Sequence, residues 1–173
     1  VFDYRVEETA DALAMSAANV KTTHHRARRA MAAYDTARTP ITREKQNAAR
    51  AAVERFVAGL ATRDLATIES ALAADAREIS DGGGEFLSAL RPIHGARNVA
   101  RFFLGISDDP ALEYRADVRV LNGLPALVVR VGNAGPRRAP RFVVTVDIDA
   151  SGKIREIHTV SASRKVTHIS FPD

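Results

Sequence analysis

The sequence predicts an α+β fold, and three observations indicate this class. Apolar residues recur at helical spacing through the first part of the chain. From Tyr114 onward, short stretches instead alternate apolar and polar side chains, as half-buried strands do. Turn dipeptides such as Asn122-Gly123 separate these stretches. Helices followed by consecutive strands are typical of an α+β protein with an antiparallel sheet, and not of a parallel doubly wound sheet.

A short helix is predicted over residues 5–14. Val6, Ala10 and Leu13 recur there at helical spacing and should face inward. Two glutamates stand in the first turn, where negative charge interacts favourably with the helix dipole. Residues 14–16 are predicted to break the helix.

A second helix is predicted over residues 17–34, with Ser16 as its N-cap. The residues expected on its inward face are Val20, His24, Ala27 and Met31. The stretch 16–34 is basic and holds no acidic residue, which suits a polyanionic partner. The alternative is a solvated helix face with ordinary arginines. Two helices joined by a short turn, the second of them basic, make a helix-turn-helix over residues 1–34.

Residues 35–45 are predicted to be a linker, because this stretch carries Pro40 and several threonines. A second domain should follow over residues 46–173. Its expected helices cover residues 46–61, 65–74 (with Asp64 as N-cap) and 97–106. Its expected strands cover residues 77–80, 114–121, 126–131, 141–148 and 154–160.

Composition excludes several kinds of protein. The 173 residues include no cysteine, so disulfides, thiolate metal sites and cysteine nucleophiles are absent from this chain. No apolar run approaches the ~18 residues of a membrane span, and no signal peptide opens the chain. We therefore expect a cytoplasmic protein without membrane contacts. The chain begins at Val1 and not at methionine, so we expect it to be a piece of a longer protein.

The string VFDYRVEETADALAMSAANVKTTHHRARRAM resembles region 4.2 of extracytoplasmic-function sigma factors. In that family, region 4 reads the −35 promoter element in the major groove. The resemblance implies two sets of contacts with promoter DNA. The residues facing the groove would be Ala18, Asn19, Lys21, Thr22 and His25. The residues holding phosphates would be Arg26, Arg28 and Arg29.

Two departures from the family pattern fall in the predicted seam between these helices. Thr9 replaces the usual isoleucine, and His24 stands where a core leucine is expected. The 173 residues also lack region 2, through which these factors bind the RNA polymerase core, so this chain cannot act as a complete sigma factor. The first 34 residues are either a working DNA reader cut from a longer chain or a remnant whose helices serve only as packing.

The rest of the sequence resembles the SnoaL-like domain that a subgroup of these sigma factors carries, with a ketosteroid-isomerase-like fold. The segments that carry the resemblance are VERFVAGLATRDLATIESALAADA, SDGGGEFLSALRPIHGARNVARFFLG and LNGLPALVVRV. The resemblance implies a cone of curved antiparallel sheet and three helices. It also implies a segment that regulates the sigma regions, here Asp81, Gly82, Gly83, Gly84 and Lys165. Glu85 replaces the family's lysine, and of its N-P-D-K-L motif only Lys165 survives.

The cone of this fold encloses a pocket that suits a small-molecule ligand. Our candidate pocket residues are Phe56, Phe102, Tyr114 and His158. No catalytic or metal-binding constellation is recognisable, so we expect neither enzymatic activity nor a cofactor. The alternatives to transcription regulation are a stand-alone ligand-binding or isomerase-like protein with a vestigial helical arm, or an interaction module that forms a homodimer.

Overall fold

The computed structural model describes residues 4–37 and 41–172. The chain divides into two compact units, Val1–Pro40 and Ile41–Asp173. Within the described residues, no helix is both long and apolar enough to cross a membrane.

The first unit contains two helices, α1 (Val6–Ala12) and α2 (Ala17–Ala37). The predicted N-cap of α2 is confirmed, because the Asn19 backbone N–H donates to Ser16 Oγ at 3.2 Å. Ala14, in the connecting turn, has a φ of 51°, which is left-handed backbone. The second helix continues through Ala37 and so takes up the first residues of the predicted linker, 35–37.

Fewer residues are buried between α1 and α2 than the sequence predicts. Ala10 and Val20 are buried against each other's helices, but Leu13 is 61% exposed and Met31 is 46% exposed. His24 and Ala27 are also exposed. The predicted inward stripe is therefore wrong beyond Val20, because the seven residues of α1 reach only the first turns of α2.

The two departures from the sigma-factor pattern weaken this seam less than the sequence suggests. The Thr9 side chain is half-buried, and its hydroxyl donates to the Arg5 carbonyl at 2.9 Å. Its polar group is thus satisfied within its own helix. His24 lies outside the seam, on the exposed part of α2.

The second unit contains three α-helices, two of which begin at a capping side chain. The helix α3 (Arg43–Thr62) starts earlier than predicted, because Thr42 Oγ1 accepts from the Lys45 backbone N–H at 3.2 Å. The helix α4 (Leu65–Ala71) is capped by Asp64, as predicted. The helix α5 (Ala96–Ile106) matches its prediction to within one residue.

The six strands form one curved sheet in the order β2-β1-β6-β5-β4-β3. Their bounds are β1 (Leu72–Asp81), β2 (Ile93–His94), β3 (Glu113–Leu121), β4 (Leu124–Gly132), β5 (Arg141–Ile148) and β6 (Ile154–Val160). The predictions for β5 and β6 are confirmed residue for residue, and the α+β class is confirmed. The expected purely antiparallel sheet is wrong, because β1 pairs parallel with β6 while the other neighbours are antiparallel.

The predicted extension of the second helix to residue 74 is also wrong. The chain leaves α4 at Ala71 and enters β1 at Leu72, whose strand partner is Ile154. Leu72 and Ala73 are both buried. Two consecutive apolar residues fit the pattern of a helix and the pattern of a strand equally well. The pairing with a distant strand decides between the two.

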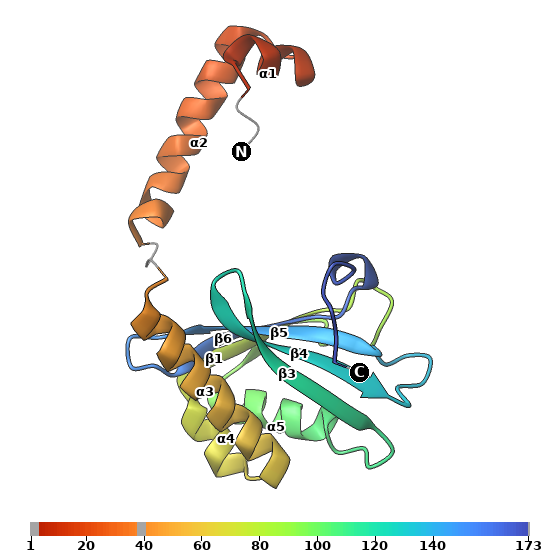
Figure 1. Cartoon of the computed structure of the whole chain (residues 1–173). Coiled ribbons are helices and arrows are strands. Elements are labelled where there is room, and N and C mark those ends of the chain that lie inside the picture. Colours follow the sequence, from red (N-terminus) through yellow and green to blue (C-terminus); the bar gives the residue numbers. More distant parts are fainter. Residues whose placement is uncertain (1–3, 38–40, 173) are drawn as a thin grey trace. The chain divides into compact units, whose positions relative to one another are not determined.

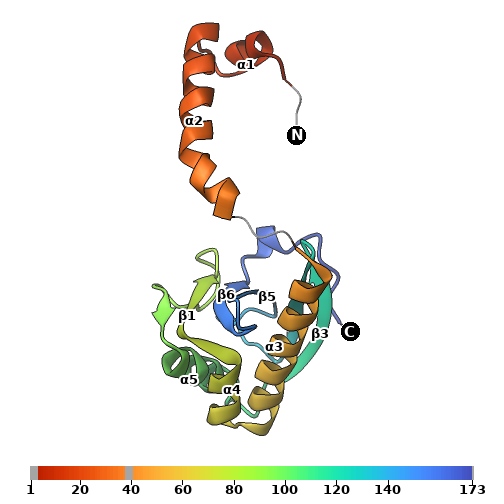
Figure 2. The ribbon, with the colours of Figure 1, turned by 90° about the vertical axis from the view of Figure 1, so that its left-hand side faces the viewer.

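The three helices cover one face of the curved sheet (Figures 1 and 2). The main core lies between these layers and includes Phe56, Ile68, Phe103, Val144 and Ile157. The Phe103 ring meets the rings of Phe56 and Phe102 edge to face, with centroid distances of 5.1 Å and 5.4 Å.

The C-terminal segment, residues 166–172, packs on the opposite face of the sheet (Figure 1). Val166 is fully buried there with Ala126, Val128 and Val143, and Ile169 and Phe171 pack around them. Three arginines of neighbouring strands also hold the segment. The contacts run from Arg119 to the Ser170 carbonyl (2.5 Å), from Arg130 to the Pro172 carbonyl (3.5 Å) and from Arg141 to the Phe171 ring centroid (5.6 Å).

Candidate functional site

The exposed basic half of α2 is the first candidate surface. All eight residues predicted to contact DNA are exposed: Ala18, Asn19, Lys21, Thr22, His25, Arg26, Arg28 and Arg29. At about 3.6 residues per turn, they fall within one half of the helix circumference. Val20, which packs on α1, lies on the opposite half. The helix pair thus leaves a continuous cationic surface with small polar residues among the arginines.

The glycine turn after β1 and the start of the C-terminal segment form the second candidate. Lys165 Nζ lies 2.5 Å from Asp81 Oδ2, and the Gly83 backbone N–H donates to Asp81 Oδ1 at 3.0 Å. The Asp81 carbonyl accepts from the Ser161 and Ala162 backbone N–H groups at 2.9 Å and 3.2 Å. Gly83 has a φ of 61°, and a Cβ there would lie 2.7 Å from Ala162 Cβ. The structure therefore brings together Asp81, Gly83 and Lys165, three residues of the segment that the family resemblance groups.

The contact between Asp81 and Lys165 should contribute stability that depends on pH. The hydrogen bond from Lys165, together with that from Gly83, lowers the pKa of Asp81 below its ordinary value of 3.8. A carboxylate with a lowered pKa stabilises the folded state above its ordinary pKa, and this contribution is lost as the pH falls through the lowered value. We expect Lys165→Met to be less stable than the native chain at pH ~7. The difference should vanish below the lowered pKa.

Urea unfolding followed by circular dichroism over a pH series measures this difference. The control is Arg164→Met, which removes a neighbouring exposed charge that makes no ion pair among the described residues. A difference between the native chain and Lys165→Met that stays constant from neutral to acid pH would contradict the assigned contact.

A cavity of about 380 Å³ on the helix-covered side of the sheet is the third candidate. Its lining is mostly apolar, and this size is within the range of small-molecule sites. Its apolar part includes Leu87, Ala89, Phe102, Ile106, Leu112, Tyr114, Val131 and Phe142. Its polar lining comes from Ser80, Ser88, Arg138, Thr159 and Ser161.

Two of the four residues predicted from the sequence line this cavity, namely Phe102 and Tyr114. The Tyr114 hydroxyl donates to the Ile106 carbonyl at 2.8 Å, and burial raises the pKa of this tyrosine. Phe56 does not line the cavity, because its ring is buried in the core against Phe103. His158 does not line it either, because alternation along β6 places its side chain on the other face of the sheet from Thr159.

Glu78, next to the cavity-lining Ser80 on the same face of β1, is not among the residues predicted from the sequence. This side chain is fully buried, and its Oε1 accepts from the Ser80 hydroxyl at 2.5 Å. Its Oε2 is buried near the Thr159 hydroxyl, whose oxygen is buried as well. Burial raises the pKa of Glu78, and the hydroxyls of Ser80 and Thr159 offset part of this rise. The alternation Ala76, Glu78, Ser80 along β1 is the signal that could have found it.

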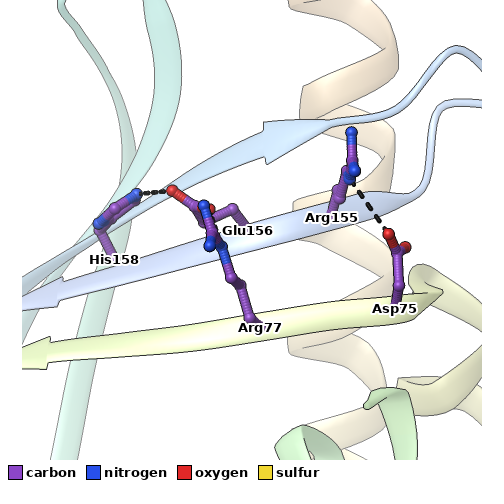
Figure 3. A network of polar contacts seen from close by, with 5 residues as sticks. All are labelled: Asp75, Arg77, Arg155, Glu156 and His158. Atoms are coloured by element: carbon purple, nitrogen blue, oxygen red, sulfur yellow. Dashed lines mark hydrogen bonds and ion pairs between the residues drawn. The ribbon is translucent and has the colours of Figure 1, made fainter. Parts of the chain in front are cut away.

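A network of charged side chains crosses the β1–β6 pair (Figure 3). Arg155 Nε lies 3.3 Å from Asp75 Oδ2. Glu156 pairs with both Arg77 and His158, and its Oε1 lies 2.5 Å from His158 Nε2. The groove beside the network is also lined by His94 and Asp147. Within the network itself, the two carboxylates of Asp75 and Glu156 pair with the two guanidinium groups of Arg155 and Arg77. The described residues hold no group of three side chains that could bind a metal ion.

Comparison with known proteins shows the fold. A scan against protein-family models and a search of curated proteins each find no match. Among solved structures, the chain is similar to the extracytoplasmic-function sigma factor SigJ of Mycobacterium tuberculosis, with 24% identity and a TM-score of 0.60. That match covers 96% of this chain and 56% of SigJ, so the chain corresponds to little more than half of that protein's length.

Two further structures are similar over about two thirds of the chain. One is a protein with a cystatin-like fold from Methylobium petroleophilum PM1 (19% identity, TM-score 0.53, 66% of this chain and 75% of that chain). The other is an NTF2-like protein from Mesorhizobium loti (14% identity, TM-score 0.52, 67% of this chain and 92% of that chain). Together these similarities show a mixed α+β fold with a curved sheet, as in NTF2-like proteins.

Proposed function

We propose that this chain takes part in bacterial transcription as part of an extracytoplasmic-function sigma factor. In this proposal α1 and α2 form a helix-turn-helix that reads the −35 promoter element. The SnoaL-like α+β unit modulates this reading, with the turn at Asp81 and Lys165 as its regulatory segment. Contact with the RNA polymerase core belongs to sigma regions that the 173 residues do not include.

The observation that carries the proposal is the exposed cationic half of α2. The three arginines supply guanidinium groups suited to phosphates, and Asn19 and Lys21 supply donors suited to base edges. Val20 is buried on the half of α2 opposite the cationic residues, and those residues are exposed, so the cationic half is not needed to hold the unit together. The similarity to SigJ, which extends over 96% of the chain, supports the same assignment.

Salt-dependent binding to duplex DNA tests this function. We expect the chain to bind labelled duplexes selected from a pool with a randomised −35 region, and to bind them less tightly as salt rises. In Arg26→Ala/Arg28→Ala the affinity should fall, and the slope of log affinity against log salt should decrease by about 2, one for each lost phosphate contact. Fluorescence anisotropy over a salt series measures both quantities.

The matched control is Arg50→Ala/Arg55→Ala, which removes the same charge from exposed positions of α3. It should bind DNA nearly as the native chain does. If the two double variants lose affinity equally, the binding reflects net charge and the proposed reader is rejected. Absence of any binding would mean that α1 and α2 serve only as packing.

A second function, small-molecule binding, is favoured by the cavity. Its apolar walls and few polar groups are typical of ligand sites in proteins. In a transcription regulator, such a ligand would favour one conformation of the α+β unit over another. In a stand-alone protein, binding the ligand would itself be the function. Isomerase-like chemistry has less support, because Tyr114 and Asp81 already bond to protein groups.

A further inference from the structure

The strand β3 leaves one of its edges without a partner strand. It is the last strand in the order of the sheet, and among the described residues only β4 pairs with it (Figure 1). The other edge strand, β2, has two residues, whereas β3 has nine. A long open edge presents backbone N–H and C=O groups that can pair with another strand. The edge of β3 is therefore a candidate interaction surface.

The turn after β3 determines which backbone groups face this edge. Asn122 and Gly123 form a two-residue turn with φ values of 51° and 81°, and Leu121 pairs with Leu124 across it. In such a hairpin the pair that flanks the turn is hydrogen-bonded, and bonded and non-bonded pairs alternate along the strands. The odd-numbered residues of β3 thus bond to β4. The N–H and C=O groups of the even-numbered residues point toward the open edge.

The charges of β3 are complementary to those of a second, antiparallel copy of the strand. The face that meets the C-terminal segment carries, in order, Glu113, Arg115, Asp117 and Arg119. If two copies pair about Ala116, Arg115 lies opposite Asp117 of the second copy. Glu113 then lies opposite Arg119, and two-fold symmetry repeats both contacts. Pairing about Arg115 or about Asp117 instead places like charges opposite each other, which is unfavourable.

The apolar side chains of β3 match in the same register. They lie on the other face of the strand, where Tyr114 is 40% exposed and Val120 is 57% exposed. Pairing about Ala116 places Tyr114 opposite Val118 of the second copy. It also places Val120 beside Leu112, which directly precedes β3. Association would therefore cover apolar surface that one copy leaves exposed.

The ion pair within β3 is compatible with this arrangement. Asp117 Oδ2 lies 2.9 Å from the Arg119 guanidinium of the same chain. A carboxylate accepts hydrogen bonds at both oxygens, so Asp117 can also hold Arg115 of the second copy without releasing Arg119. Ala116 forms a hydrogen-bonded pair with its counterpart, which makes the neighbouring charged pairs non-hydrogen-bonded ones, whose side chains lie closer together.

We propose that two copies of this chain associate edge to edge through β3, in antiparallel register centred on Ala116. Such a dimer joins the two sheets into one and goes beyond the DNA reading and ligand binding proposed above. A single pair of strands is a small interface, so we expect a weak dimer with a Kd of about 1–100 µM.

Charge reversal tests the register on the full chain. Sedimentation velocity from about 1 to 500 µM should show a dimer that forms with rising concentration. Arg115→Glu and Asp117→Arg each place like charges opposite each other at two contacts, so each should raise the Kd about tenfold or more. An equal mixture of these two variants should dimerise about as tightly as the native chain, because every charged contact between the two variants is again between opposite charges.

Two further variants separate the edge from net charge. Arg101→Glu makes the same charge reversal at an exposed position of α5 and should keep the native Kd. Ala116→Pro removes an N–H that points to the open edge and leaves the hydrogen bonds to β4 in place. It should abolish the dimer while the circular dichroism spectrum of the chain stays unchanged.

A native chain that stays monomeric at every concentration overturns the proposal, and the alternating charges then protect the edge against pairing. A dimer that Arg115→Glu does not weaken, or that the mixture of variants does not restore, also overturns it, because the interface then lies elsewhere. Neither result bears on the DNA reader, since the exchanged residues lie outside α1 and α2.

Discussion

Replacing Phe103 by alanine is expected to lower the free energy of unfolding of the α+β unit by about 3–5 kcal/mol. The Phe103 ring is 5% exposed and lies at the centre of the layer between helices and sheet. It meets Phe56 of α3 and its neighbour Phe102 edge to face, so its removal leaves a void between two helices. Urea unfolding followed by circular dichroism measures the loss.

The control for this variant is Leu90→Ala, because Leu90 is 97% exposed and its truncation leaves no void. We expect its free energy of unfolding to stay within about 0.5 kcal/mol of the native value. A loss for Phe103→Ala no larger than that of Leu90→Ala would contradict the core described above.

Gly59→Ala is expected to destabilise the same unit by about 1–3 kcal/mol. Gly59 lies in α3 where α4 crosses it, and an added Cβ would lie 2.7 Å from Ile68 Cγ1 and 2.9 Å from the Ile68 backbone nitrogen. Because the nitrogen belongs to the backbone, α4 as a whole would have to move. This cost exceeds the gain of about 0.5–1 kcal/mol that alanine normally brings to a helix interior.

The same substitution in α5 should have the opposite sign. A Cβ at Gly105 would meet no atom within 4 Å, so Gly105→Ala should raise the free energy of unfolding by about 0.5–1 kcal/mol. Thermal and urea unfolding of the two variants measure both changes in the free energy of unfolding. Comparing them separates the effect of packing between helices from the effect of helix propensity. Effects of equal sign in both variants would contradict the close approach of α3 and α4.

Local patterns in the sequence were sufficient to predict many of the helices and strands of this fold. The bounds of β5 and β6 follow from strict alternation between turn residues, and α5 follows from apolar residues at helical spacing. The cap of α2 at Ser16 and the cap of α4 at Asp64 were also predictable, because each depends on a side chain within three residues of the N–H groups that it accepts.

Features that depend on distant residues were not predictable from such patterns. The start of β1 at Leu72 requires its partner Ile154, and no local signal separates this strand from a longer helix. Phe56 is equally apolar in a core and in a cavity wall, so only the packing against Phe103 decides its place. Glu78 was missed because a charged residue beside Arg77 reads as solvent-exposed, whereas the pairing of β1 with β6 buries it.

The position of β6 has a consequence for how the α+β unit is made. This strand comes last in the sequence but lies in the middle of the sheet, between β1 and β5. Without β6, no strand pairing joins β1 and β2 to β3, β4 and β5, so each group would have an open edge. Joining them requires closure of a long loop, which slows folding and prolongs the exposure of those edges. The unit must therefore fold after its last strand is synthesised, and a chain that stops before Ile154 loses the centre of its sheet.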